Sequence, residues 1–96
     1  MEKTKEMNLD LIKDGEVKVK EALKDLFDGK LDCVNVKNIT PKLFENYVGN
    51  YAEFDDNIDF NGWQCDYWYR CEYKNEIYSV FGGAWYGNAT IERGII

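Results

Sequence analysis

The sequence contains no histidine, one proline and three cysteines among its 96 residues. Without histidine it lacks the side chain that most often acts as a general base near neutral pH, and no Cys–His catalytic pair can form. No apolar run approaches the roughly 18 residues of a transmembrane helix, so we expect none. The polar start, residues 1–6, has no apolar segment typical of a secretion signal. We therefore expect a cytoplasmic protein that is not an enzyme.

The three cysteines are predicted to be buried, reduced thiols. Their number is odd, and no CxxC motif occurs. Cys65 and Cys71 lie in one expected strand, about 20 Å apart at roughly 3.3 Å per residue. Disulfide-bonded Cα atoms lie within about 7 Å of each other, so this pair cannot form a bridge while the strand is straight. No spacing of cysteines supports a zinc site, and we expect no cofactor.

All of the net charge belongs to the second half of the chain. Residues 1–42 carry nine lysines and nine acidic residues, which cancel. Residues 43–96 carry Arg70, Lys74 and Arg93 against nine acidic residues, which accounts for the net charge of -6. This half also holds 14 of the 15 aromatic residues. An acidic, aromatic surface favours a basic protein partner and disfavours direct binding to nucleic acid or an anionic membrane.

The first half of the chain predicts helices. In residues 16–28, apolar side chains recur at intervals of three and four, which indicates an amphipathic helix capped by Asp14 and ended by Gly29. Its expected buried face is Val19, Ala22, Leu23, Leu26 and Phe27. Residues 9–19 also permit a β-hairpin with Asp14-Gly15 as a type I′ turn, and this alternative stays open.

Two further elements complete this half. Residues 31–36 form a β-rich run that predicts a short strand. Thr40 and Pro41 are typical of an N-cap and a first helical residue, and Gly49 is placed to end the helix that they begin. The buried face of this helix is expected to be Leu43, Phe44, Tyr47 and Val48.

The second half predicts an antiparallel sheet. Residues 64–73 alternate between mostly apolar odd and mostly polar even positions, which indicates a half-buried strand with its odd side chains inward. A three-residue loop at 74–76 would place Cys71 opposite Ser79 in the returning strand. Gly82-Gly83 then bends or ends that strand, and short β segments follow at residues 84–86 and 89–92.

These elements predict an α+β fold, in which an N-terminal helix or helices pack on a 4–5-stranded antiparallel sheet. A chain of 96 residues is too short to bury two separate cores, so we expect a single domain over residues 1–96.

The acidic segment 53–62 invites comparison with a calcium-binding loop. The first, third, fifth and sixth positions of such a loop are matched by Asn57, Asp59, Asn61 and Gly62. The twelfth position is Trp68, where the bidentate glutamate belongs, so we expect no metal. A solvated loop of turn-forming residues is the simplest interpretation.

The composition of the same segment favours a protein-binding surface over a metal site. Its carboxylates alternate with Phe54 and Phe60, so charge that steers a partner lies beside apolar groups that anchor it. Trp68 joins them, because alternation places it on the polar face of its strand. The candidate contacts are Glu53, Asp55, Asp56, Asp59, Trp63 and Trp68.

These patterns predict a non-catalytic binding protein that docks on a basic site of a larger, nucleic-acid-handling protein and blocks it. In size, acidity and lack of catalytic motifs, the chain resembles phage anti-defence proteins such as anti-CRISPR inhibitors, and also toxin-neutralising immunity proteins. This resemblance in general style implies an inhibitor and assigns no residues. Two alternatives stay open: a module that stacks a sugar or nucleotide on its rings, and a structural subunit that self-assembles through its aromatic face.

Overall fold

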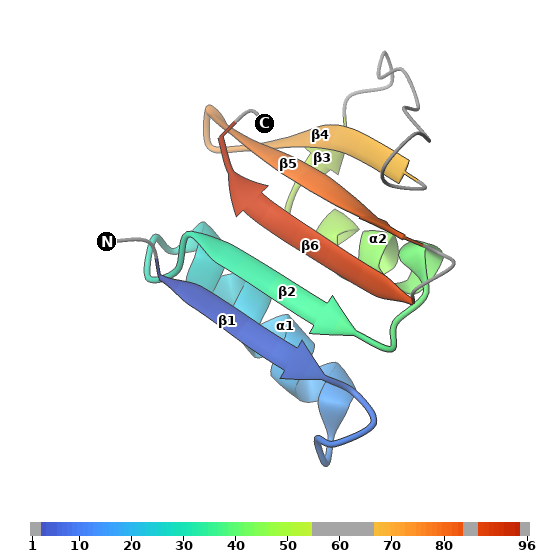
Figure 1. The fold of residues 1–96 in the computed structure, drawn as a ribbon. Coiled ribbons are helices and arrows are strands. Elements are labelled where there is room, and N and C mark those ends of the chain that lie inside the picture. The colour runs from blue at the N-terminus through green and yellow to red at the C-terminus, as the bar shows by residue number, and fades with distance from the viewer. Residues whose placement is uncertain (1–2, 55–66, 84–86, 95–96) are drawn as a thin grey trace.

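The computed structural model describes residues 3–54, 67–83 and 87–94. In chain order, their elements are β1(Thr4–Asn8), α1(Gly15–Phe27), β2(Cys33–Lys37), α2(Pro41–Gly49), β3(Glu53–Phe54), β4(Tyr67–Tyr73), β5(Glu76–Gly83) and β6(Asn88–Arg93). The strands form one sheet in the order β1-β2-β6-β5-β4-β3 (Figure 1). β1 is parallel to β2, and every other pair of neighbours is antiparallel.

The α+β class is confirmed, whereas the expected 4–5-stranded antiparallel sheet is wrong, because the sheet has six strands and is mixed. The difference arises mainly from β1, which lies at one edge and reaches β2 through the crossover helix α1. Its sequence, Thr-Lys-Glu-Met-Asn, has little of the β-branched and aromatic character that marks strands. A parallel pair needs such a long connection, which local patterns do not reveal.

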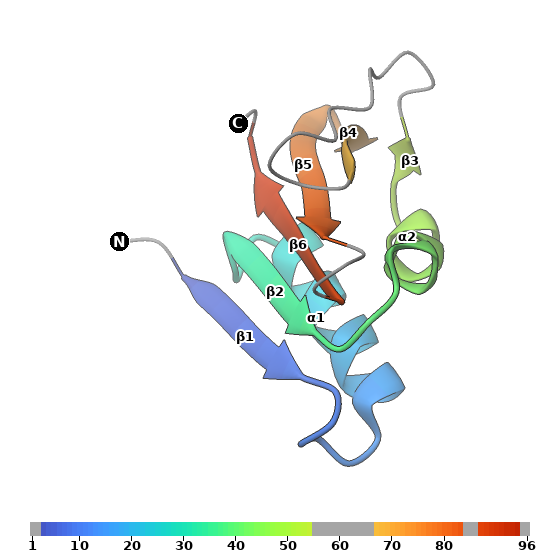
Figure 2. The same cartoon turned by 45° about the vertical axis from the view of Figure 1, so that its right-hand side comes forward.

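Both helices lie on the same face of the sheet (Figures 1 and 2). α1 packs mainly against β2, and α2 lies near β6. The strands point most of their buried residues at the helices, and these include Met7, Val34, Val36, Cys71, Tyr78, Val80, Ala89 and Ile91. Cys33 and Ser79 are buried too, although their side chains lie on the opposite face. No described helix or strand covers the opposite face, which we call the helix-free face.

α1 confirms the expected helix, and all five residues of its expected inner face are buried. The alternative hairpin at residues 9–19 is wrong. A type I′ turn needs positive φ at both central residues, whereas only Asp14, at 58°, has it and Gly15 begins the helix. This left-handed backbone also explains why the Asp14 side chain makes no capping hydrogen bond, because an N-cap residue normally has extended geometry.

The end of α1 is closed by its own backbone. Gly29 adopts a φ of 86°, and its N–H donates to the Leu26 carbonyl at 3.1 Å. The Lys30 N–H donates to the Asp25 carbonyl at 2.8 Å. This pair of bonds is the Schellman arrangement, and it confirms Gly29 as the stop.

α2 begins as expected. The Thr40 hydroxyl accepts a hydrogen bond from the Leu43 N–H at 3.2 Å, and Phe44, Tyr47 and Val48 are buried. Leu43 was expected on the buried face but is 39% exposed. Leu43 lies at the edge of the stripe formed by the other three, about 100° around the helix from Phe44, and is therefore only partly covered. Neither α1 nor α2, within the described part of the chain, is long and apolar enough to cross a bilayer.

The β4–β5 hairpin corrects the expected register. The strands are joined by a two-residue turn, Lys74-Asn75, in place of a three-residue loop. Both turn residues have positive φ, 50° and 67°, which is the geometry of a type I′ turn. Tyr73 consequently pairs with Glu76.

This shift of one residue changes which side chains of β5 reach the core. Cys71 lies opposite Tyr78, not Ser79. Tyr78 and Val80 therefore point at the helices and are fully buried, while Ile77 turns outward and is 40% exposed. β5 continues through Gly82 and ends at Gly83, and the expected β segment at residues 84–86 lies outside the described residues.

We predict that the double change Lys74→Asn with Asn75→Gly stabilises the protein by about 1 kcal/mol. A lysine held in the left-handed region costs roughly that amount, and Asn-Gly is the preferred type I′ pair. Urea denaturation measures the free energy of unfolding. The matched change Asn75→Val should lower the free energy of unfolding. A valine variant more stable than the double variant would contradict the turn assignment.

Arg93, at the end of β6, joins the sheet to α1. Its Nη2 donates to the carbonyls of Leu26 and Leu31, at 2.9 and 3.0 Å. Its Nη1 lies 3.6 Å from Glu76 Oε2, a carboxylate oxygen that also accepts from the Tyr78 hydroxyl at 3.1 Å. The Leu26 carbonyl belongs to the last turn of α1, where a cation is favoured by the helix dipole.

An aromatic cluster fills the space beside this guanidinium. The Phe27 ring lies 4.9 Å from both Tyr73 and Tyr78 and 5.5 Å from Tyr51, measured between ring centroids. These rings come from α1, β4, β5 and the segment after α2. Arg93 and Phe27 therefore hold the C-terminal end of α1 to the sheet by polar and apolar contacts together.

Replacing Arg93 by Met should lower the free energy of unfolding by about 2 kcal/mol, because it leaves two carbonyls without a charged donor. Arg93→Lys should recover only part of the loss, since one ammonium does not reproduce the planar fork of donors. The measurement is chemical denaturation, with the exposed Lys30→Met as the matched control. A loss no larger than that of the control would show that Arg93 does not hold α1.

Candidate functional site

The candidate site lies on the helix-free face, where the sheet register aligns side chains from different strands. One row across the sheet consists of Trp68, Phe81, Thr90, Asn35 and Glu6. The next row consists of Arg70, Ser79, Glu92, Cys33 and Thr4. At the far edge of the sheet, Glu53 of β3 lies directly opposite Glu72 of β4.

Trp68 and Arg70 form the aromatic part of this site. They are two residues apart on β4, so both side chains are on the same face, and both are half-buried. The guanidinium carbon of Arg70 lies 5.3 Å from the centre of the Trp68 ring, a cation–π contact. Phe81, also half-buried, lies directly opposite Trp68 on β5. Two rings and a guanidinium are thus clustered beside the acidic edge.

Glu53 and Glu72 form the acidic part. Both are exposed, and like charges directly opposite one another destabilise a strand pair. Within the described residues, neither carboxylate forms an ion pair. Arg70 lies next to Glu72 on the same face of β4 but stacks on Trp68. The repulsion between the two glutamates is therefore not offset by a described cation.

The structure brings together two of the expected contacts. Glu53 and Trp68 lie on the same face, because Glu53 is opposite Glu72 and Glu72 is four residues from Trp68 on β4, an even spacing. Glu72 and Trp68 are about 13 Å apart along the strand. The remaining expected contacts lie outside the described residues, and they are Asp55, Asp56, Asp59 and Trp63. The calcium-loop positions Asn57, Asn61 and Gly62 lie outside them as well.

Sequence reasoning missed Glu72 and Phe81 as members of this site. Glu72 was detectable, since it shares the even-numbered positions of its strand with Trp68. Phe81 was not, because the expected three-residue turn placed it opposite Tyr69 and on the inner face. Only the two-residue turn brings Phe81 next to Trp68.

The described part of this face presents two rings, a guanidinium and two carboxylates. In the described ranges 3–54, 67–83 and 87–94, no cluster of three or more metal-ligating side chains occurs. Burial raises the pKa of the Cys71 thiol from 9.0 to about 12, so at neutral pH this free cysteine is protonated and is a poor nucleophile. Cys33 is buried too, and Cys65 lies outside the described residues.

We predict that the protein loses stability in alkali above about pH 9. Burial raises the pKa of Cys71 from 9.0 to about 12, and burial and the hydrogen bond to Glu76 raise that of Tyr78 from 10.0 to about 12. Both groups therefore ionise at lower pH in the unfolded chain, so their contribution is complete below pH 9 and is lost as pH rises toward 12. Each group costs up to about 1.4 kcal/mol per pH unit in that window.

Urea denaturation at about pH 8 and about pH 10 measures this slope. The variant Cys71→Ala should retain the tyrosine contribution and lose that of the thiol, giving a shallower fall just above pH 9. Equal slopes for the two proteins would contradict the buried thiol as a source of the effect.

No protein-family model, curated protein or solved structure matches the chain. Functional conclusions therefore depend on the chemistry of its own surfaces. The stacking and self-assembly alternatives stay predictions.

Proposed function

We propose that this protein is a non-catalytic, cytoplasmic binding protein that docks its helix-free face on a basic site of a larger, nucleic-acid-handling protein and blocks that site. The observation that carries the proposal is the Glu53–Glu72 pair. Two exposed carboxylates lie directly opposite one another with no described cation to neutralise them. A lysine or arginine from a partner would turn this repulsion into attraction.

The aromatic side chains beside the pair supply the apolar part of the contact. Trp68 and Phe81 are adjacent across β4 and β5 and remain partly exposed. Tryptophan and arginine are the side chains most often found at the energetic centre of protein interfaces. Arg70 stacks on the Trp68 ring, so its charge does not cancel that of Glu72 through an ion pair. The site thus offers anchors next to unneutralised acid.

Charge also favours one class of partner. The whole net charge of -6 comes from residues 43–96, which include β3, β4 and β5. Concentrated patches of lysine and arginine are typical of proteins that bind the phosphate backbone. An acidic surface that occupies such a patch would compete with nucleic acid for it, which is the action of an inhibitor.

The proposal is tested by reversing the two charges. Glu53→Lys with Glu72→Lys should abolish capture of basic proteins from a nuclease-treated host lysate, because the partner would then meet lysines in place of carboxylates. The matched control, Asp10→Lys with Glu45→Lys, makes the same charge change at exposed positions outside the site and should retain capture. Captured proteins are identified by mass spectrometry and their affinity is measured at low and high salt.

Two results would contradict the proposal. One is an equal loss of capture in the control, which would show dependence on net charge alone. The other is a set of bound proteins that is unchanged by the Glu53 and Glu72 reversal. A captured partner should also lose its own nucleic-acid binding when this protein is added, and retention of that activity would exclude the blocking role.

A further inference from the structure

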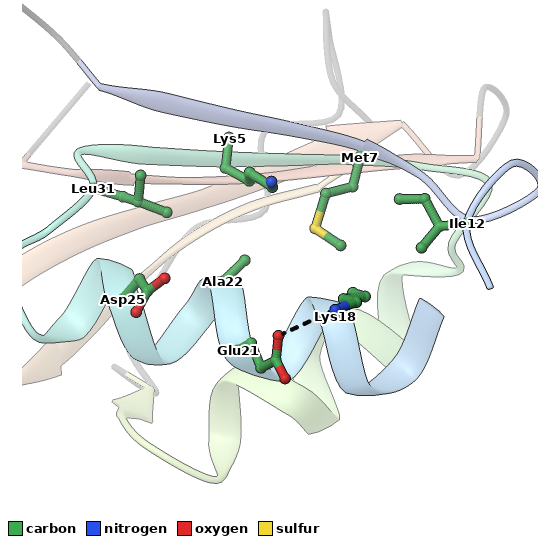
Figure 3. A pocket seen from close by; sticks show the side chains of 8 residues that line it. All are labelled: Lys5, Met7, Ile12, Lys18, Glu21, Ala22, Asp25 and Leu31. Carbon is green, nitrogen blue, oxygen red and sulfur yellow. Dashed lines mark ion pairs between the residues drawn. The ribbon is translucent and has the colours of Figure 1, made fainter. Parts of the chain in front are cut away.

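A cavity of about 520 Å³ lies between the edge strand β1 and helix α1, on the opposite edge of the sheet from the Glu53–Glu72 pair (Figure 3). Volumes of roughly 300–1,000 Å³ are typical of small-molecule sites. Its apolar lining consists of Met7, Ile12, Ala22 and Leu31. The cavity exists because α1 packs mainly on β2, the neighbour of β1, and leaves the underside of β1 partly uncovered.

Charged side chains surround this apolar lining, two of each sign. Lys18 and Glu21, both on α1, form an ion pair at 3.7 Å. Lys5 of β1 and Asp25 of α1 also line the cavity, and within the described part of the chain neither forms an ion pair. Figure 3 shows the Lys5 ammonium over the cavity and the Asp25 carboxylate on its other wall. The wall formed by β1 therefore carries an ammonium group, that of Lys5, and the wall formed by α1 carries a carboxylate, that of Asp25. Neither group is paired with another described residue.

The position of Asp25 is unfavourable for the helix itself. It lies in the last turn of α1, where the helix dipole is negative and repels a carboxylate. Asp25 is half-buried, and no described cation neutralises it. Natural proteins break such local rules mainly at functional or strained positions. A bound ammonium group would supply the missing compensation.

We propose that this cavity binds a small zwitterion with an apolar body, the chemistry of a free apolar amino acid. Its carboxylate pairs with the Lys5 ammonium, its ammonium pairs with the Asp25 carboxylate, and its side chain covers Met7 and Ala22. A simple anion or cation fits less well, because it would meet an unpaired charge of its own sign on one wall. This site is independent of the helix-free face and of its proposed partner.

The experiment compares three ligands that share one apolar body: L-leucine, 4-methylpentanoate, which lacks the ammonium, and 3-methylbutylamine, which lacks the carboxylate. Titration is followed by the backbone amide NMR shifts of the intact protein. Leucine should bind up to about fivefold more tightly than either half-ligand, as expected for one partly exposed ion pair. The shifted amides should be those of β1 and α1.

Two variants assign the charges. Lys5→Met should weaken leucine binding, because the ligand carboxylate loses its partner, and should strengthen binding of 3-methylbutylamine, because the like charge on the cavity wall is removed. Asp25→Asn should likewise weaken leucine binding, because the ligand ammonium loses its partner, and should strengthen binding of 4-methylpentanoate. The matched controls are Lys24→Met, on α1, and Asp28→Asn, at its C-cap; both positions lie outside the cavity, and both variants should bind leucine normally.

Three results would overturn the proposal. They are leucine binding no tighter than that of both half-ligands, amide shifts located away from β1 and α1, and equal losses in the cavity variants and their controls. The first two need no variant, so the proposal remains falsifiable even where a substitution disturbs folding.

Discussion

The contact between Arg93 and the C-terminal end of α1 is the interaction on which the arrangement of the two layers depends. It joins the last strand to carbonyls at positions 26 and 31, and Phe27 reinforces it with a cluster of tyrosine rings. Because one end of α1 is held beneath β5 and β6, the helix crosses under β2 and diverges from β1. The cavity under β1 follows from that placement.

Both candidate sites lie where packing ends, at the two edges of the sheet. Edge strands are normally kept short or charged, since exposed backbone groups invite unwanted pairing. β3 has two residues, one of them Glu53, and β1 carries Lys5 and Glu6. Two of these edge charges, Glu53 at one edge and Lys5 at the other, form no ion pair with another described residue. A role in edge protection and a role in recognition are physically compatible, because both require solvent-exposed charge.

The elements that could be predicted from the sequence are those set by interactions between residues close together in the chain. Residues 16–28 and Thr40–Pro41 predicted both helices, because helical periodicity and capping are read within a few residues. The β4–β5 hairpin was predicted with the wrong register, because Lys74-Asn75 is a weak type I′ signal and both residues adopt positive φ only in the folded hairpin. β1 was missed altogether, because it becomes a strand by pairing with β2 some 29 positions later. The cavity could not be predicted without it.

By itself, the sequence determined both helices, their buried faces apart from Leu43, and the concentration of acid and rings in residues 43–96. It also determined that Glu53 and Trp68 are candidates for contact. The tertiary structure alone decided which charges meet. Glu53 is paired with Glu72 across two strands, and Lys5 and Asp25 line the same cavity. Backbone hydrogen bonds and packing between distant segments set the strand register and the helix placement that bring these charges together. Composition records how many charges a chain has, and only the fold decides which of them remain unneutralised.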